Sequence, residues 1–166
     1  MQELLSAYQR NDPAAGSKAM VLLLYSGVHA VLFHKLSHWL YGHRRYFLAR
    51  FISQAARHIT GIEIHPAAII GKNLVIDHGM GVVIGATARI GDDCLLYHGV
   101  TLGAARITQG KRHPTVGNGV TIGCGAKILG PVSLGDGCRI GANAVVLQDI
   151  PAGATVVGVP GRILNQ

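Results

Sequence analysis

The segment VGNGVTIGCGAKILGPVSLGDGCRIGANAVV, residues 116–146, has an aliphatic residue at every sixth position. Glycine directly follows four of these six positions, which are Val116, Ile122, Ile128, Leu134, Ile140 and Val146. A fixed six-residue repeat is typical of a parallel β-helix, in which each hexad forms a short strand with a turn and three hexads form one triangular coil. We expect the aliphatic side chains to point into this prism, while glycine lets the backbone turn its tight corners.

The same period extends back to Ile64. Two further aliphatic series, offset from each other by two residues, are Ile64, Ile70, Ile76 and Val82, then Ile84, Ile90, Leu96 and Leu102. The stretch from Ile64 to Val157 provides material for about five coils, stacked at the parallel-strand spacing of roughly 4.8 Å. Fourteen residues separate Leu102 from Val116, where six or twelve would keep the register, so residues 104–115 are predicted to include an extruded loop. Loops on a rigid scaffold often carry function.

Residues 1–60 follow a helical pattern instead, with apolar residues three and four positions apart and few glycines or prolines. We expect a short first helix, a second over about 17–41 and a third over about 44–59. Asp12 before Pro13 is also a common pair at the start of a helix, so helix capping alone would account for Asp12.

The composition limits the classes of function. Fifteen Lys and Arg against eight Asp and Glu give a net charge of +7, which favours an acidic small ligand over an acidic partner protein. Aromatic residues make up only 5% of the chain, too few to stack nucleic-acid bases, so no nucleic acid partner is expected. The three cysteines form no CxxC pair and are odd in number, so reduced thiols and a cytoplasmic location are expected.

The longest apolar run, residues 19–33, is interrupted by Ser26, Gly27 and His29. It is shorter than the ~20 residues that a membrane span needs. The N-terminus also lacks the basic segment that begins a signal peptide. We interpret the run as a core helix and expect no membrane association.

Two acid–histidine pairs stand near the start of the repeats, Glu63 with His65 and Asp77 with His78. Because a glycine follows His78, its imidazole has room for a substrate, and a carboxylate elsewhere could orient the ring. This pattern indicates general-base chemistry in outline. A solvated or core-edge role is favoured over metal binding for the histidines of the helical segment, which are His29, His34, His38 and His43.

Several longer motifs are more specific than the six-residue period. They are Asn11-Asp12-Pro13-Ala14, Gly61-Ile62-Glu63-Ile64-His65-Pro66, Ile76-Asp77-His78-Gly79, Gly99-Val100-Thr101-Leu102-Gly103, Lys111-Arg112-His113-Pro114 and Val157-Gly158-Val159-Pro160. Together they resemble the serine O-acetyltransferases, a family of left-handed β-helix acyltransferases built from hexapeptide repeats, over nearly the whole chain. The resemblance implies a mainly β fold, in which an N-terminal α-helical segment, residues 1–60, precedes a left-handed parallel β-helix, residues 61–166.

In that family the residue matching His78 is the general base, and the acid matching Glu63 pairs with it. A serine hydroxyl is a weak nucleophile until a base with a pKa near neutrality removes its proton during attack on the thioester of acetyl-CoA. The carboxylate fixes the tautomer of the imidazole and stabilises the imidazolium. The alternative interpretations are a corner histidine bonded to the backbone and a solvated glutamate.

By the same resemblance Asp12 and Asp77 hold the amino group of L-serine, while Arg112 and His113 hold its carboxylate. Acids at one end and a planar cationic fork at the other suit a zwitterion. An exposed basic loop tip is the alternative interpretation for Arg112. Cysteine is a possible feedback inhibitor at this site, as in the family.

The resemblance also places acetyl-CoA, the co-substrate, in the groove between neighbouring prisms of a homotrimer whose three sites lie between subunits. The positions that match the family's contacts are Ala104, Cys124 and Ala142, and Arg139 is a possible phosphate partner. Small residues permit close approach of the pantetheine arm, and the net positive charge favours the CoA phosphates. The repeat geometry alone would also account for the small residues. No metal is expected.

The chain departs from the family pattern at four positions. Ala86 replaces a glutamate, His98 a glutamine, Ala104 a glycine and Gly161 an alanine, which leaves the identity of the acceptor open. The helical segment is shorter than in the long enzymes, so strong pairing of trimers is not expected. The sequence ends without the family's isoleucine-terminated tail, which leaves docking to cysteine synthase in doubt.

Three alternatives to serine acetylation stay open. The first is the same transfer to another small hydroxy amino acid. A metal-dependent hydratase like the γ-type carbonic anhydrases would use the same prism, but it needs about three histidines that converge on zinc, and the coils contain no His-x4-His pair. A non-catalytic trimeric scaffold is disfavoured by the intact Asp77, His78, Arg112 and His113.

Overall fold

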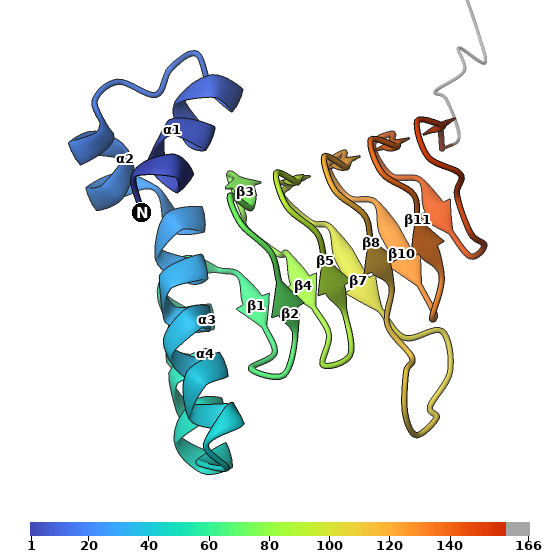
Figure 1. Cartoon of the computed structure of the whole chain (residues 1–166), viewed down its shortest axis with the longest axis horizontal. Helices are drawn as coiled ribbons and strands as arrows, with labels where there is room; N and C mark the ends of the chain where they lie inside the picture. Colours follow the sequence, from blue (N-terminus) through green and yellow to red (C-terminus); the bar gives the residue numbers. More distant parts are fainter. Residues whose placement is uncertain (159–166) are drawn as a thin grey trace, which may run out of the picture.

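The computed structural model describes residues 1–158, which form four helices followed by fourteen short strands. Figure 1 shows the strands stacked into a prism with the helices at its N-terminal end. The Val159-Pro160 half of the last sequence motif and the terminal residues 161–166 lie outside the described residues.

The helical segment consists of α1 (Gln2–Asn11), α2 (Lys18–Leu24), α3 (Ser26–Gly42) and α4 (Tyr46–Thr60). The expected single helix over residues 17–41 is therefore wrong, because the chain bends by 69° between α2 and α3. Tyr25, at the bend, has an extended backbone with φ −89° and ψ 111°. At this bend the hydroxyl of Tyr25 donates a hydrogen bond to Asp12.

Helices α3 and α4 lie side by side across the end of the prism (Figure 1). Small buried residues of α4, among them Ala49 and Ala56, permit this close approach. Gly61 ends α4 with a φ of 72°, a left-handed conformation that glycine adopts without strain. The chain then enters its first strand at Glu63, so the end of α4 fixes the position of this carboxylate.

No single helix within residues 1–158 is long and apolar enough to cross a membrane. The bent pair of α2 and α3 reaches the required length and composition only when both helices are counted together.

The strands form three parallel sheets, one for each face of the prism. The first sheet contains β1 (Glu63–Ile64), β4 (Val83–Ile84), β7 (Thr101–Gly103), β10 (Lys127–Leu129) and β13 (Val145–Val146). The second contains β2 (Ile69–Ile70), β5 (Arg89–Ile90), β8 (Thr115–Val116) and β11 (Ser133–Leu134). The third contains β3 (Val75–Asp77), β6 (Leu95–Tyr97), β9 (Thr121–Ile122), β12 (Arg139–Ile140) and β14 (Thr155–Val156).

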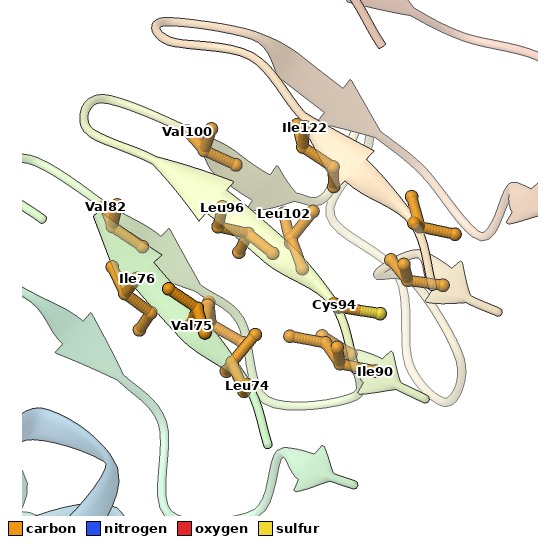
Figure 2. Packing of buried hydrophobic residues seen from close by; sticks show 14 of the residues in the cluster. Leu74, Val75, Ile76, Val82, Ile90, Cys94, Leu96, Val100, Leu102 and Ile122 are labelled. Atoms are coloured by element: carbon orange, nitrogen blue, oxygen red, sulfur yellow. The ribbon is translucent and has the colours of Figure 1, made fainter. Parts of the chain in front are cut away.

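The register of the sheets confirms the predicted parallel β-helix. Each coil takes one strand from each sheet, and a bridge between Leu134 and Ile150 completes the fifth coil. In the third sheet Ile76 pairs with Leu96, which pairs with Ile122, so residues of the six-residue series stack directly on one another. These side chains fill the prism (Figure 2) and are almost fully buried. Burial of each such side chain stabilises the fold by about 1.5–3 kcal/mol.

The position of the two-residue slip differs from the prediction. Val82 was expected to continue the series of Ile64 and Ile76, but Ile64 pairs with Ile84 instead. Val82 belongs to a second inward row and stacks beneath Val100 (Figure 2). The two additional residues therefore lie between Ile76 and Val82, in the corner that contains His78.

A loop leaves the prism between the first and second sheets. The chain departs from β7 after Gly103 and enters β8 at Thr115, and the residues between them project away from the coils (Figure 1). The loop returns through Arg112 and His113, two of the residues that the sequence motifs indicate.

The helices and the coils share one hydrophobic core. Tyr8 and Val28 of the helices belong to the same buried cluster as Ile62 and Ile76 of the first coil. The division of the chain into two domains at residue 61 therefore stays a prediction, although helices and strands are separate in sequence.

Gly27 marks the closest approach of α3 to the first coil. A methyl group there would overlap the Ile76 carbonyl oxygen and the Tyr8 hydroxyl. We expect Gly27→Ala to destabilise the protein by about 1–3 kcal/mol, because the Ile76 carbonyl belongs to the backbone and the helix must move away from it. Urea unfolding at a fixed protein concentration measures this change.

Gly42, at the other end of the same helix, provides the matched control. A methyl group there meets no atom within 4 Å, so Gly42→Ala is expected to be neutral or to stabilise by up to about 1 kcal/mol. Equal effects of the two substitutions would contradict the proposed contact.

Candidate active site

A pocket of about 280 Å³ lies where the helical segment meets the first coil. Its walls include Asp12 from the connection after α1, Tyr25 at the bend, and Asp77 with His78 at the end of β3. Three of the residues indicated by the sequence motifs, Asp12, Asp77 and His78, are thus brought together within one chain.

Asp12 is held by two hydrogen bonds. Its Oδ1 accepts from the backbone N–H of Ala14 at 2.8 Å, and its Oδ2 accepts from the hydroxyl of Tyr25 at 2.6 Å. The hydrogen bond from Tyr25, followed by that from Ala14, lowers the pKa of the Asp12 carboxyl and keeps it ionised. The capping alternative for Asp12 is wrong, because Ser17 caps the next helix and Asp12 follows the end of α1.

His78 lies in the lengthened corner between the third and first sheets. Its φ of 58° is uncommon for a residue other than glycine, and its side chain is 76% exposed, so the imidazole is accessible to a substrate. The corner is tied to the end of α4 by a hydrogen bond from the Gly81 N–H to the Gly61 carbonyl at 2.9 Å. Asp77 Oδ2 lies 3.9 Å from Nε2 of His78.

Glu63 starts the first strand of the prism at this same corner. Its backbone N–H donates to the carbonyl of Val82 at 2.9 Å, so Glu63 lies one coil below the residues that follow His78. Its carboxylate, however, contacts Nε of Arg57 at 3.4 Å. Within residues 1–158 the carboxylate found within 4 Å of His78 is that of Asp77, and pairing of Glu63 with His78 stays a prediction.

A row of corner residues continues upward from His78. The ring of His98 lies 6.0 Å from that of His78 in an edge-to-face arrangement. Backbone hydrogen bonds from Gly99 to Met80, from Gly125 to His98 and from Asn143 to Cys124 place these corners in successive coils. We call this row the His78 edge, and its members are His78, Met80, His98, Cys124 and Ala142.

The four residues expected at acetyl-CoA do not all share one place. Cys124 and Ala142 belong to the His78 edge, and Cys124 is partly exposed there. Ala104 follows β7 and lies at the opposite side of the first sheet. Arg139 lies in β12 of the third sheet, where it is exposed.

Arg112 and His113 form a second group. The backbone N–H groups of both residues donate to Oγ1 of Thr87, at 3.0 and 3.1 Å, and the N–H of Thr87 donates to Nδ1 of His113 at 3.1 Å. The imidazole of His113 is buried over Gly85, where any Cβ would overlap it. Burial, followed by the charge of Arg112, lowers the pKa of His113. Thr87 therefore anchors the loop, a role that no sequence motif indicated.

The two groups lie at opposite sides of the first sheet. Strand β4 runs from the His78 corner to Gly85, so one strand separates His78 from the residues that hold His113. We call this second corner, Gly85 to Ala88 with the loop residues Lys111 to His113, the His113 edge. One chain brings Asp12, Asp77 and His78 together, and it brings Arg112 and His113 together, but it does not join the two groups.

Other imidazoles lie at the junction of α3 with the prism. His34 is buried in α3, and Nδ1 of His38 lies 2.7 Å from the carbonyl oxygen of Pro66. Burial, together with the charge of His38, lowers the pKa of His34 to about 4. Burial, together with the charge of Arg50, lowers that of His65 to about 4. Residues 1–158 contain no group of three or more His, Cys, Asp and Glu residues arranged to hold a metal ion.

These two lowered pKa values predict that acid destabilises the fold. The ordinary pKa of 6.5 applies in the unfolded chain, so between pH 6.5 and about 4 the unfolded state binds more protons than the folded state. The contribution of neutral His34 is complete above pH 6.5, amounts to about 3 kcal/mol, and is lost as pH falls to about 4. The urea midpoint should therefore decrease over this window, and His34→Gln should reduce the slope. A midpoint that is flat from pH 6.5 to 4 would contradict this assignment.

A known family of repeats matches part of the prism. The family model described as bacterial transferase hexapeptide (six repeats) matches residues 113–148. This matched segment includes strands β8 to β13 of the prism, so the later coils are similar to the hexapeptide repeats of bacterial transferases.

More complete relatives identify the family within that class. A serine acetyltransferase of Helicobacter pylori is 59% identical over 157 residues, which are 95% of this chain and 92% of that protein. Because this similarity is high and covers nearly all of both proteins, the chain belongs to the serine acetyltransferase family, and the predicted resemblance is confirmed.

Solved structures agree in fold. Serine acetyltransferase from Neisseria gonorrhoeae in complex with serine is 41% identical with a TM-score of 0.91, and the match covers 98% of this chain and 66% of that one. The Brucella abortus enzyme in complex with coenzyme A is 40% identical with a TM-score of 0.93, covering 99% and 66%. Isoform 3 from Entamoeba histolytica in complex with cysteine is 40% identical with a TM-score of 0.93, covering 99% and 60%. The chain thus spans just under two thirds of these structures.

Proposed function

We propose that this protein transfers the acetyl group of acetyl-CoA to the hydroxyl group of L-serine, producing O-acetylserine for cysteine biosynthesis. The observation that carries the proposal is the pocket that joins Asp12, Asp77 and His78. Related enzymes of the same fold have been solved with serine and with coenzyme A, which supports both substrates.

His78 is the proposed general base. An imidazole titrates near neutrality and can take the proton of the serine hydroxyl while the oxygen attacks the thioester carbonyl. The tetrahedral intermediate collapses with cleavage of the C–S bond, and the imidazolium returns the proton to the sulfur of the departing CoA. The exposed position of His78 at a prism corner leaves room for both substrates.

The three acidic residues near His78 have different proposed roles. Asp12 and Asp77 are the proposed partners of the serine ammonium group, because both carboxylates line the pocket beside His78. Glu63 is proposed to orient the imidazole of His78. Its place at the start of β1, one coil below the His78 corner, supports this role, although its carboxylate contacts Arg57 within the single chain.

Arg112 and His113 are proposed to bind the serine carboxylate from a neighbouring subunit. Within one chain they lie at the His113 edge, across the first sheet from His78, so one small substrate can contact both groups only where two copies meet. A homotrimer with three sites between subunits satisfies this requirement with closed symmetry. Light scattering that gives a monomer at micromolar concentration would contradict the shared site.

The acetyl-CoA site is proposed to follow the His78 edge. Above His98 the edge continues with Cys124 and then Ala142, and these small side chains let the pantetheine arm lie close to the backbone corners. Ala104 would be contributed across the subunit groove, and Arg139 would meet a phosphate of CoA. The net charge of +7 favours this anionic co-substrate.

Ala86 leaves the identity of the molecule that accepts the acetyl group open. Ala86, Thr87 and Lys111 line a second pocket of about 360 Å³ at the His113 edge, where the family pattern has a glutamate in place of Ala86. A free-thiol assay with acetyl-CoA and a panel of serine, threonine and homoserine tests the acceptor. We expect the highest kcat/KM with serine. A tenfold preference for another hydroxy amino acid would replace serine as the substrate.

Cysteine is proposed as a competitive inhibitor. It carries the same ammonium and carboxylate groups as serine, and the Entamoeba histolytica relative has been solved in complex with cysteine. Calorimetric titration of cysteine should show binding that decreases as serine is added. Simultaneous, independent binding of both amino acids at millimolar concentration would contradict the proposed pocket.

A cytoplasmic location is proposed from the thiols. All three cysteines are free, and Cys94 and Cys138 are buried in the prism. Burial raises the pKa of the Cys94 thiol to about 11, which keeps it protonated and inert. A chain that needs no disulfide suits a reducing compartment.

A further inference from the structure

Tyr25 makes a contact in the pocket that no sequence motif indicated. It lies at the bend between α2 and α3, and its hydroxyl donates a 2.6 Å hydrogen bond to Oδ2 of Asp12. A hydrogen bond from a hydroxyl to a carboxylate at this distance is of the strong, charge-assisted type. The tyrosine therefore acts on a group that the proposed function assigns to the substrate.

The hydrogen bond from Tyr25 fixes the Asp12 carboxylate but leaves some of its acceptor sites available. An ionised carboxylate has about four acceptor sites, and the Ala14 N–H takes one of them on Oδ1 while Tyr25 takes one on Oδ2. Both oxygens keep a free lone pair for a cationic partner. Because the hydrogen bond from Tyr25 also favours the ionised form, the negative charge of Asp12 persists when the site is empty.

Tyr25 is itself braced against the strand that carries the other acid. Its ring packs edge-to-face on Tyr8, with 5.8 Å between the ring centroids and 85° between the ring planes. The buried hydroxyl of Tyr8 accepts the backbone N–H of Ile76 at 3.1 Å, and Ile76 directly precedes Asp77. The two tyrosines thus connect Asp12 to β3, and they set the position of one pocket acid relative to the other.

We propose that Tyr25 is a positioning residue that holds Asp12 where it receives the ammonium group of the amino acid substrate, with Tyr8 as its support. This inference rests on the proposed function and adds a determinant of amino acid affinity to it. The contact of Asp12 with the serine ammonium group stabilises the bound substrate and the transition state equally. Loss of the Tyr25 hydroxyl should therefore raise KM for serine and leave kcat unchanged. KM for acetyl-CoA should also stay unchanged.

Tyr25→Phe is the direct test, because it keeps the ring that packs on Tyr8 and removes only the hydroxyl. We expect a rise of roughly three- to tenfold in KM for serine and in the calorimetric Kd for serine, as for loss of one hydrogen bond. Tyr46→Phe, an exposed tyrosine at the start of α4, is the matched control and should match the parent. An unchanged KM and Kd for serine, or a fall in kcat with KM unchanged, would overturn the assignment.

A double-mutant cycle separates positioning from a direct contact. In the Asp12→Asn background, Tyr25→Phe should change KM for serine by less than about twofold, because its effect passes through Asp12. Full additivity of the two substitutions would mean that Tyr25 acts independently of Asp12, which would overturn the proposal. If the parent protein released no CoA with serine, the proposed function would fail instead, and the calorimetric Kd would still decide the role of Tyr25.

Discussion

Replacing His78 with alanine is expected to lower kcat for serine acetylation by about 10²- to 10⁴-fold while the protein still binds acetyl-CoA. The imidazole is the group that removes the proton of the attacking hydroxyl, and alanine supplies no base in its place. Because His78 has a positive φ, His78→Asn should be measured beside His78→Ala, since asparagine adopts this conformation at little cost. Comparable losses in both variants, with the oligomeric state of the parent retained, would assign the effect to the imidazole.

The role of Glu63 can be separated from its ion pair. Glu63→Gln removes the carboxylate, whereas Arg57→Gln removes the same ion pair and leaves the carboxylate in place. We expect Glu63→Gln to slow turnover and Arg57→Gln to leave it near the parental value, because an exposed ion pair contributes at most about 1 kcal/mol. The double variant of His78 and Glu63 should resemble His78→Ala, since the two groups act as a unit.

A near-parental kcat in His78→Ala would exclude His78 as the base and make His98 the next candidate.

Mixed trimers of two inactive variants are expected to regain activity. His78→Ala lacks the base and Arg112→Ala lacks the carboxylate partner, so each homotrimer should be nearly inactive. If every site takes His78 from one subunit and Arg112 from the next, any trimer that contains both variants has one native site. Such trimers should therefore show about one third of the parental kcat. The physical reason is the separation of the His78 edge from the His113 edge within one chain.

The mixed trimers can be prepared by co-expression with two different affinity tags and purification through both. A matched control combines His78→Ala with Asp77→Asn, two substitutions on the same edge, and this combination should stay inactive. Activity in the control, or its absence in the mixture of His78→Ala with Arg112→Ala, would contradict sites shared between subunits.

The parallel β-helix could be predicted because an aliphatic residue at every sixth position is typical of that fold. The pairs Ile122 with Ile140 and Ile128 with Val146, in which the partners are three hexads apart, follow directly from that period. The motifs containing Asp12 and His78 were also sufficient to indicate the pocket that the structure shows between them.

Other features depend on tertiary contacts that no period reveals. The apolar run of residues 19–33 looks like one helix, but the structure bends at Tyr25, where Gly27 lies against the first coil and Tyr25 bonds to Asp12. The slip near Val82 could be counted in sequence but not located, because both placements keep aliphatic residues inside. The role of Thr87 could not be predicted, because it depends on the path of a loop that returns twenty-five residues later.

Serine acetylation is tested directly by identifying the product that the protein forms from acetyl-CoA and L-serine. We expect the purified protein to form O-acetylserine, detected by mass spectrometry, in equal amounts with the CoA released. His78→Asn should form neither above background. Release of CoA without O-acetylserine, or no release from the folded parent protein with both substrates at millimolar concentration, would contradict the proposed function.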